Sequence, residues 1–141
     1  MTIAIVNTDM NVGPFKIPGN GQNMILNNYA ERNKIVVEEI IPEPFMSNAL
    51  ATTQWVHKKK KLKKVILCSI HQLPQQQKRI DDLINTMDDV EFHFALENIS
   101  GTGSKFLLDC TKEAKIFKEA KIIDSTKTTW SELYNLKQKS E

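Results

Sequence analysis

Cysteine, glycine and proline are all scarce in this chain: its 141 residues include two cysteines, five glycines and five prolines. The cysteines, Cys68 and Cys110, are far apart and lie in apolar segments. This placement predicts two buried free thiols in a reducing compartment. No Cys-x-x-Cys pair and no cysteine–histidine spacing typical of a metal site occurs, so we expect no metal ion.

The chain also lacks long hydrophobic runs. No stretch approaches the roughly 20 apolar residues that a transmembrane helix needs. The first ten residues, MTIAIVNTDM, place no basic residues ahead of their short apolar run, which does not fit a secretory signal. We therefore expect a cytoplasmic protein with no membrane segment.

An excess of one charge is missing too, because 19 basic and 17 acidic residues leave a net charge of +2. This balance does not by itself indicate a nucleic-acid-binding protein. One local exception is the segment KKKKLKK at residues 58–64, which holds six lysines. Such a run can bind a polyanion, but it contains no arginine and has only Trp55 nearby as an aromatic neighbour. We favour a solvated helix end, and nucleic-acid binding ranks third among our hypotheses.

Signature motifs of several enzyme classes are absent as well. The chain has no GxSxG nucleophile elbow, no P-loop and no GxGxxG dinucleotide motif. The sequence therefore predicts no cofactor.

What the sequence does contain is a regular alternation of short apolar segments and longer amphipathic ones. With 40% hydrophobic and 26% charged residues, the composition is that of a globular protein, and the length fits a single domain over residues 1–141. Apolar, β-branched runs predict strands at residues 2–7, 34–40, 64–69 and 90–95. Helical spacing predicts helices at residues 22–33, 46–60, 75–87 and 104–120. Ile122 and Ile123 are a candidate edge strand, and residues 125–139 a final helix.

Strands that alternate with helices are typical of an α/β protein. We predict three layers built on a mostly parallel sheet of four or five strands, with strand order 2-1-3-4. Ligands of such sheets bind beyond the carboxyl ends of the strands. Three segments meet there: the loop 8–21 with the two residues after it, SIHQLP at 69–74, and ALENIS at 95–100. Their polar rim is a candidate binding site, formed by Lys16, Pro18, Gln22, Asn23, Ser69, His71, Gln72, Glu97 and Asn98.

Each rim residue also has a purely structural interpretation. Gln22 either contacts a ligand or caps its helix, and the loop FKIPGNGQN either borders a pocket or only turns the chain. His71 has no second ligand at metal-binding spacing, which leaves an acid, base or ligand-contact role. Glu97 either orients His71 as a base or accepts hydrogen bonds from nearby backbone. The sequence leaves these alternatives open.

Residues 3–97 resemble the sporadic carbohydrate cluster proteins, a small bacterial family. The resemblance rests on KIPGNGQNMILNNYAERN, VILCSIHQLP and FHFALEN, and it covers about two-thirds of the chain. The matching positions are Lys16, Ile17, Pro18, Gln22, Tyr29, Cys68, Ser69, Leu73, Pro74, Leu96 and Glu97. Members of this family lie among genes for surface polysaccharide and nonulosonate-type sugars. The resemblance therefore implies a part in surface-carbohydrate biosynthesis.

A fainter resemblance connects the chain to the catalytic domain of serine recombinases, the resolvases. Phe15 to Pro18, followed by Gln22, is similar to their tyrosine-x-arginine-valine-serine segment and the glutamine after it, and Pro18 stands at the nucleophilic serine position. Residues 70–75 are similar to their leucine-aspartate-arginine-leucine-x-arginine motif, with the acid and both arginines replaced. Proline cannot attack a phosphodiester, and glutamine cannot hold a phosphate as a guanidinium does. The resemblance implies a resolvase-like, flavodoxin-like fold without strand exchange.

Three functions follow as hypotheses. The first is a protein of surface-carbohydrate biosynthesis that binds a sugar or nucleotide-sugar, with His71 and Glu97 as the acid/base candidates. The second is a non-catalytic interaction module with a degenerate resolvase-like fold. The third is polyanion binding through the lysine run. We also expect a homodimer, because Trp130, Leu133, Tyr134 and Leu136 give the predicted last helix an apolar face.

Overall fold

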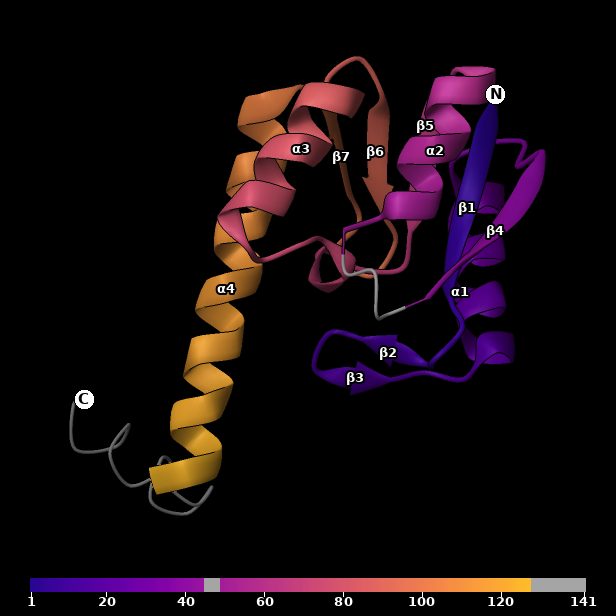
Figure 1. Cartoon of the computed structure of the whole chain (residues 1–141). Helices are drawn as coiled ribbons and strands as arrows, with labels where there is room; N and C mark the ends of the chain where they lie inside the picture. The colour runs from indigo at the N-terminus through magenta and orange to yellow at the C-terminus, as the bar shows by residue number, and fades with distance from the viewer. Residues whose placement is uncertain (45–48, 128–141) are drawn as a thin grey trace.

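A five-stranded sheet with helices on both faces forms the body of the protein (Figure 1). The structure is a computed structural model that describes residues 1–44 and 49–127, with the side chains of the last helix described as far as residue 120. The sheet order is β4-β1-β5-β6-β7. The strands are β1 (Thr2–Asn7), β4 (Glu39–Glu43), β5 (Lys64–Leu67), β6 (Glu91–Phe94) and β7 (Ile99–Thr102).

The four parallel strands follow the predicted order, and β7 joins β6 as an antiparallel strand at the edge. The centre of the sheet is apolar on both faces, which is why its strands read as continuous hydrophobic runs. Ile3, Ala4 and Ile5 of β1 and Val65 and Ile66 of β5 are all less than 2% exposed. This confirms the predicted α/β class and its mostly parallel sheet.

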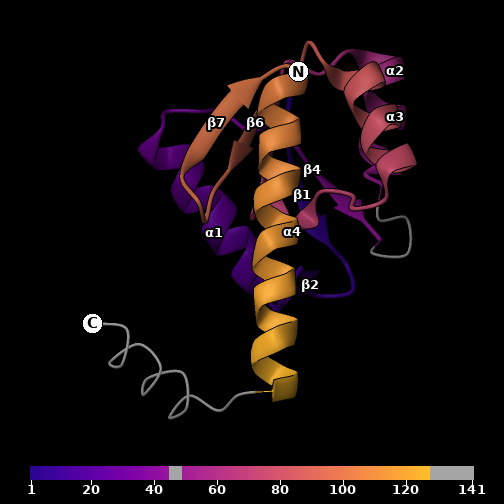
Figure 2. The same ribbon diagram turned by 90° about the vertical axis from the view of Figure 1, so that its left-hand side faces the viewer.

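The helices divide unevenly between the two faces. Helix α1 (Gly19–Arg32) covers one face with Leu26, Tyr29 and Ala30. On the other face lie α2 (Ala51–Lys60), α3 (Gln77–Met87) and α4 (Ser104–Lys127), as Figure 2 shows from the side of α4. Leu83, Met87 and Leu107 are among the residues that pack there. The three-layer arrangement is therefore as predicted.

A small hairpin occupies the segment predicted as the loop 8–21. Strands β2 (Asn11–Val12) and β3 (Phe15–Lys16) pair in antiparallel register, with Gly13 and Pro14 between them. Gly13 has φ +63°, and a Cβ on it would lie 2.1 Å from Cβ of His71. Only glycine satisfies both the left-handed backbone and the close approach. The hairpin therefore rests directly on the segment that follows β5.

The second strand lies later in the chain than predicted. Residues 34–40 were expected to form it, but β4 spans Glu39–Glu43. The chain leaves α1 through Lys34 at φ +55°, and Ile35 and Val37 then pack against the core on the α1 side without joining the ladder. Pro42 pairs with Val6 inside β4. An edge strand tolerates a proline because its outer N–H has no partner to lose.

The edge next to β6 also differs from the prediction. The expected edge strand at Ile122 and Ile123 lies instead inside α4, and the edge is formed by β7, a segment rich in turn residues. At Gly101 a Cβ would lie 2.6 Å from the Phe106 ring. Because Gly101 has no Cβ, Phe106 can pack on the strand.

Two predicted helices fall partly outside the described residues. Helix 46–60 begins at Ala51, after Leu50 in a left-handed conformation, and residues 45–48 are not described. Residues 125–127 of the predicted last helix belong to α4, whereas residues 128–141 lie outside the described part. The apolar face proposed for dimerisation is in that segment. No helix in the described ranges is long and apolar enough to cross a membrane.

Candidate functional site

The carboxyl ends of β1, β5 and β6 bring three short segments together, as predicted. They are the β2–β3 hairpin, the 3-10 helix η2 (Ile70–Gln72) and the turn around Glu97. Helix α4 passes beside η2, and its lower half continues past the hairpin (Figure 1). Strands that run parallel must end at the same edge of the sheet, which explains this convergence.

A depression of about 460 Å³ opens between these segments and α4. Its volume is within the range of small-molecule sites. Three aromatic rings, two carboxylates and two aliphatic side chains line it: Phe15, His71, Phe117, Glu97, Glu113, Ile70 and Leu96. Of the predicted site residues, only His71 and Glu97 line the depression.

Glu97 holds η2 in place. Its Oε1 accepts a hydrogen bond from the Ile70 backbone N–H at 2.8 Å, and its Oε2 accepts one from the Ser69 hydroxyl at 2.8 Å. Ser69 Oγ in turn accepts from the His71 backbone N–H at 3.2 Å. The bond from the Ile70 N–H is the kind of backbone contact that one of the two interpretations of Glu97 expected. Each carboxylate oxygen keeps acceptor capacity toward the depression.

His71 presents a half-buried ring between two phenylalanines. Its centroid lies 6.0 Å from that of Phe15 and 5.0 Å from that of Phe117. Burial lowers the pKa of His71 below 6.5, although the nearby Glu97 charge acts in the opposite direction. The imidazole is therefore neutral near pH 7, and a neutral imidazole can accept a proton or a hydrogen bond.

Ser69 and Gln72 form a capping box around η2. The Ser69 backbone N–H donates to Gln72 Oε1 at 3.2 Å, and both side chains are buried. Gln72 Nε2 has no hydrogen-bond partner among the described residues. These two residues shape the segment that carries His71 and do not themselves line the depression.

Gln22 has a structural position that differs from the predicted one on the rim. It is completely buried, and its Oε1 accepts from the Asn7 N–H at 2.8 Å. Its Nε2 donates to the carbonyls of Asn7 at 3.0 Å and Ile17 at 2.8 Å. The amide thus ties the end of β1 to the loop before α1, because it bonds to backbone groups of both segments. A ligand in the depression does not reach it.

The remaining rim residues also lie outside the depression. Lys16 and Pro18 are exposed on the hairpin side, and Asn98 is exposed with φ +55°. Asn23 has a buried Oδ1 without a partner among the described residues. Pro18 is the N-cap residue of α1.

Sequence reasoning missed Phe15, Phe117 and Glu113 as site residues. Phe117 is 45% exposed. Glu113 and Phe117 are four residues apart and therefore lie on one face of α4. The spacing in the sequence could have shown that the two residues share a face. Only the path of α4 past η2 shows that this face borders the depression.

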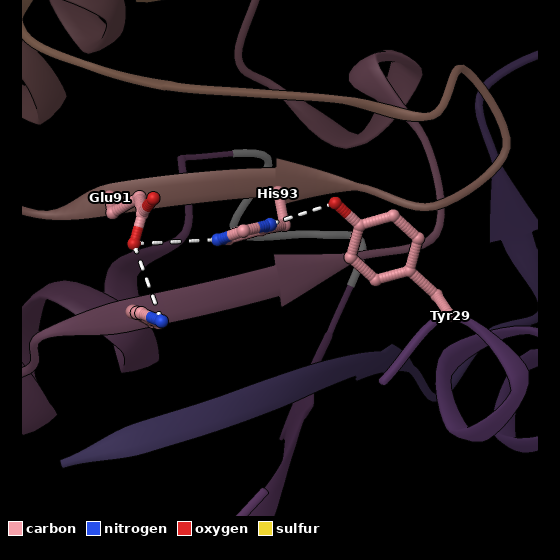
Figure 3. Close-up of polar contacts among 4 residues, drawn as sticks. Tyr29, Glu91 and His93 are labelled. Carbon is pink, nitrogen blue, oxygen red and sulfur yellow. Dashed lines mark hydrogen bonds and ion pairs between the residues drawn. The ribbon is translucent and has the colours of Figure 1, made fainter. Parts of the chain in front are cut away.

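A second polar cluster lies under α1, away from the depression (Figure 3). The Tyr29 hydroxyl is 2.8 Å from Nδ1 of His93, and Nε2 of His93 is 3.5 Å from Glu91 Oε2. Glu91 also lies 3.8 Å from the Lys64 ammonium. With its proton on Nε2, the His93 ring can accept the Tyr29 hydroxyl proton at Nδ1 and donate from Nε2 toward the Glu91 carboxylate. Burial lowers the pKa of His93 and raises that of Tyr29, so both are neutral near pH 7.

The lysine run closes α2 and continues to β5. Lys58 to Lys61 are exposed, as expected for a solvated helix end. Trp55 is 60% exposed, and the Lys59 ammonium lies 6.0 Å from the centre of its ring. The run is separate from the residues that line the depression.

Both cysteines are free and buried, as predicted. Burial raises the pKa of Cys68 to about 12 and that of Cys110 to about 11. Among the described residues no group of three or more metal-binding side chains occurs.

Comparison with known proteins identifies the fold. No family model matches the chain, and no curated protein matches it. The chain is similar in structure to the N-terminal catalytic domain of TP901-1 integrase, with a TM-score of 0.58 and 16% identity. The similarity covers 86% of this chain and 99% of that domain. At this identity the match shows the fold alone, and it confirms a resolvase-like architecture.

Proposed function

We propose that the protein binds a sugar or nucleotide-sugar in the depression, as a component of surface-carbohydrate biosynthesis. The observation that carries the proposal is the depression's position and lining. It lies at the carboxyl ends of parallel strands, where α/β proteins bind ligands, and it combines aromatic rings with carboxylates. The link to carbohydrate biosynthesis rests on the family resemblance of residues 3–97.

The lining suits a sugar for two physical reasons. The exposed ring atoms of Phe15 and Phe117, 41% and 45% exposed, offer apolar area for the C–H faces of a pyranose. The carboxylates of Glu97 and Glu113 offer acceptors for hydroxyl groups. In this proposal His71 and Glu97 are the acid/base candidates beside a bound sugar, and Lys16 on the hairpin contacts an anionic group outside the depression.

The alternative is an interaction module with a degenerate resolvase-like fold. It is favoured by the exposed apolar surface of α4, where Ile116 is 65% exposed beside Phe117. Monomeric proteins seldom leave contiguous apolar area uncovered without a use for it. In this alternative the same rings contact a protein instead of a sugar.

A thermal-shift screen of monosaccharides and nucleotide-sugars tests the proposal. A ligand at 100 times its dissociation constant stabilises the folded state by about 2.7 kcal/mol, which such a screen detects. His71→Ala and Glu97→Gln should reduce the shift, whereas Glu119→Gln, an exposed site on α4 outside the lining, should not. Absence of a shift with every sugar, together with capture of a protein partner that Phe117→Ser abolishes, would favour the alternative.

A further inference from the structure

The charge of the depression is unusual for a site that takes a nucleotide-sugar. As far as the structure describes the chain, its lining includes two glutamates and no lysine or arginine. His71 adds no positive charge, because its imidazole is neutral near pH 7. Lys118, the residue after Phe117 on α4, donates from Nζ to Gln75 Oε1 at 3.1 Å.

The aromatic rings add to the same electrostatic preference. The faces of Phe15 and Phe117 carry the negative part of the ring quadrupole, and their centroids lie 6.3 Å apart, with His71 in contact with both. A cation within about 6 Å of such a ring is attracted to it, and the attraction grows as water is excluded. Two carboxylates beside three rings form the surroundings that proteins use for ammonium groups.

We propose that the depression binds a protonated amine, so that the sugar it takes is an amino sugar with a free amino group. The sugar part of this inference rests on the proposed function, whereas the amine part rests on the lining alone. Glu113 makes the direct ionic contact, because Glu97 already accepts hydrogen bonds from Ser69 and Ile70. Phosphate groups stay outside, since two carboxylates repel them.

Nuclear magnetic resonance of the uniformly labelled full chain tests the inference with four probes. They are D-glucosamine, D-glucose, N-acetyl-D-glucosamine and tetramethylammonium, with sodium chloride as the ionic-strength control. D-glucosamine should shift the backbone amides of Ile70, His71 and Phe117 saturably. D-glucose and the acetylated sugar should bind about tenfold more weakly, a difference of about 1.4 kcal/mol, because neither carries the charge.

Matched variants separate a charge effect from a change of shape. Glu113→Gln should remove most of the preference for D-glucosamine over D-glucose, because the amide keeps an oxygen acceptor for hydroxyl groups but loses the negative charge. Glu119→Gln, on the same helix but outside the lining, should change neither.

The possible outcomes distinguish the two proposals. Equal binding of D-glucose and D-glucosamine at these amides overturns the inference and keeps the proposed function. Binding of tetramethylammonium without binding of any sugar keeps the amine site and overturns the proposed function. If none of the four probes moves these amides, both are overturned.

Discussion

Replacement of Tyr29 by phenylalanine tests whether the cluster in Figure 3 stabilises the fold. The change removes one oxygen and keeps the ring, whose centroid lies 5.6 Å from that of His93. It leaves Nδ1 of His93 without its partner at 2.8 Å, in a place where Tyr29 is 3% and His93 7% exposed. A buried polar atom that loses its partner costs about 1–3 kcal/mol.

The expected loss can be measured by urea denaturation. The midpoint should fall at unchanged slope, and the melting temperature should drop by about 4 °C for each kcal/mol lost. Ser100→Ala is the matched control, because Ser100 is exposed on β7 directly opposite His93 and should change stability by less than about 0.5 kcal/mol.

A double-mutant cycle shows whether the loss belongs to this hydrogen bond. His93→Leu removes the acceptor and leaves the phenol unpaired, so it should also destabilise. When both partners become apolar no unpaired group remains, and the double variant should lose less than the sum of the two single losses. A Tyr29→Phe variant that melts with the parent, or two losses that simply add, would show that this hydrogen bond does not stabilise the fold.

Four further predictions concern the chain as a whole. Stability should fall as the pH drops through about 6.5, because burial lowers the folded-state pKa of His71 and His93 and the unfolded chain then binds protons more readily. Denaturation midpoints at pH 7.5 and 5.5 measure this loss. His93→Leu should make the dependence of stability on pH less steep. Glutamine at all four positions 58–61 should leave sugar binding intact; salt-dependent DNA binding that these changes abolish would reverse our ranking. Incubation with DNA should trap no covalent adduct, since Pro18 has no nucleophilic atom; an adduct on a gel contradicts this. Deletion of residues 126–141 should lower the sedimentation mass from dimer to monomer, and a parent chain that already sediments as a monomer removes the basis for this expectation.

The central part of the fold could be predicted because burial there depends on local pattern. Ile3 to Ile5 and Val65 to Leu67 are covered on both faces, so hydrophobicity alone marks them as strands. The edges were harder to predict. Glycine and proline both disfavour strands. Gly101 is accepted in β7 because the Phe106 ring packs on it, and Pro42 is accepted in β4 because β4 is an edge strand.

The candidate site was predictable to the extent that strand ends determine it. Ser69, His71 and Glu97 follow β5 and β6, so topology alone brings them together. Gln22 also follows a strand in sequence, but it is completely buried and its amide bonds to the Asn7 backbone. Phe117 meets His71 because of the way α4 packs, and His93 meets Tyr29 because of the way α1 packs. No local sequence pattern predicts these contacts.

The buried thiols have a practical consequence for labelling. Maleimides react with thiolates, and at pH 7 thiols with pKa values of about 12 and about 11 are almost entirely protonated. A cysteine placed on the surface, for example by Ser100→Cys, should therefore react well before Cys68 and Cys110. Cysteines introduced in the same way on the β2–β3 hairpin and on α4 can carry a pair of fluorophores while Cys68 and Cys110 stay in place. The distance between the two fluorophores can then be measured with and without a sugar.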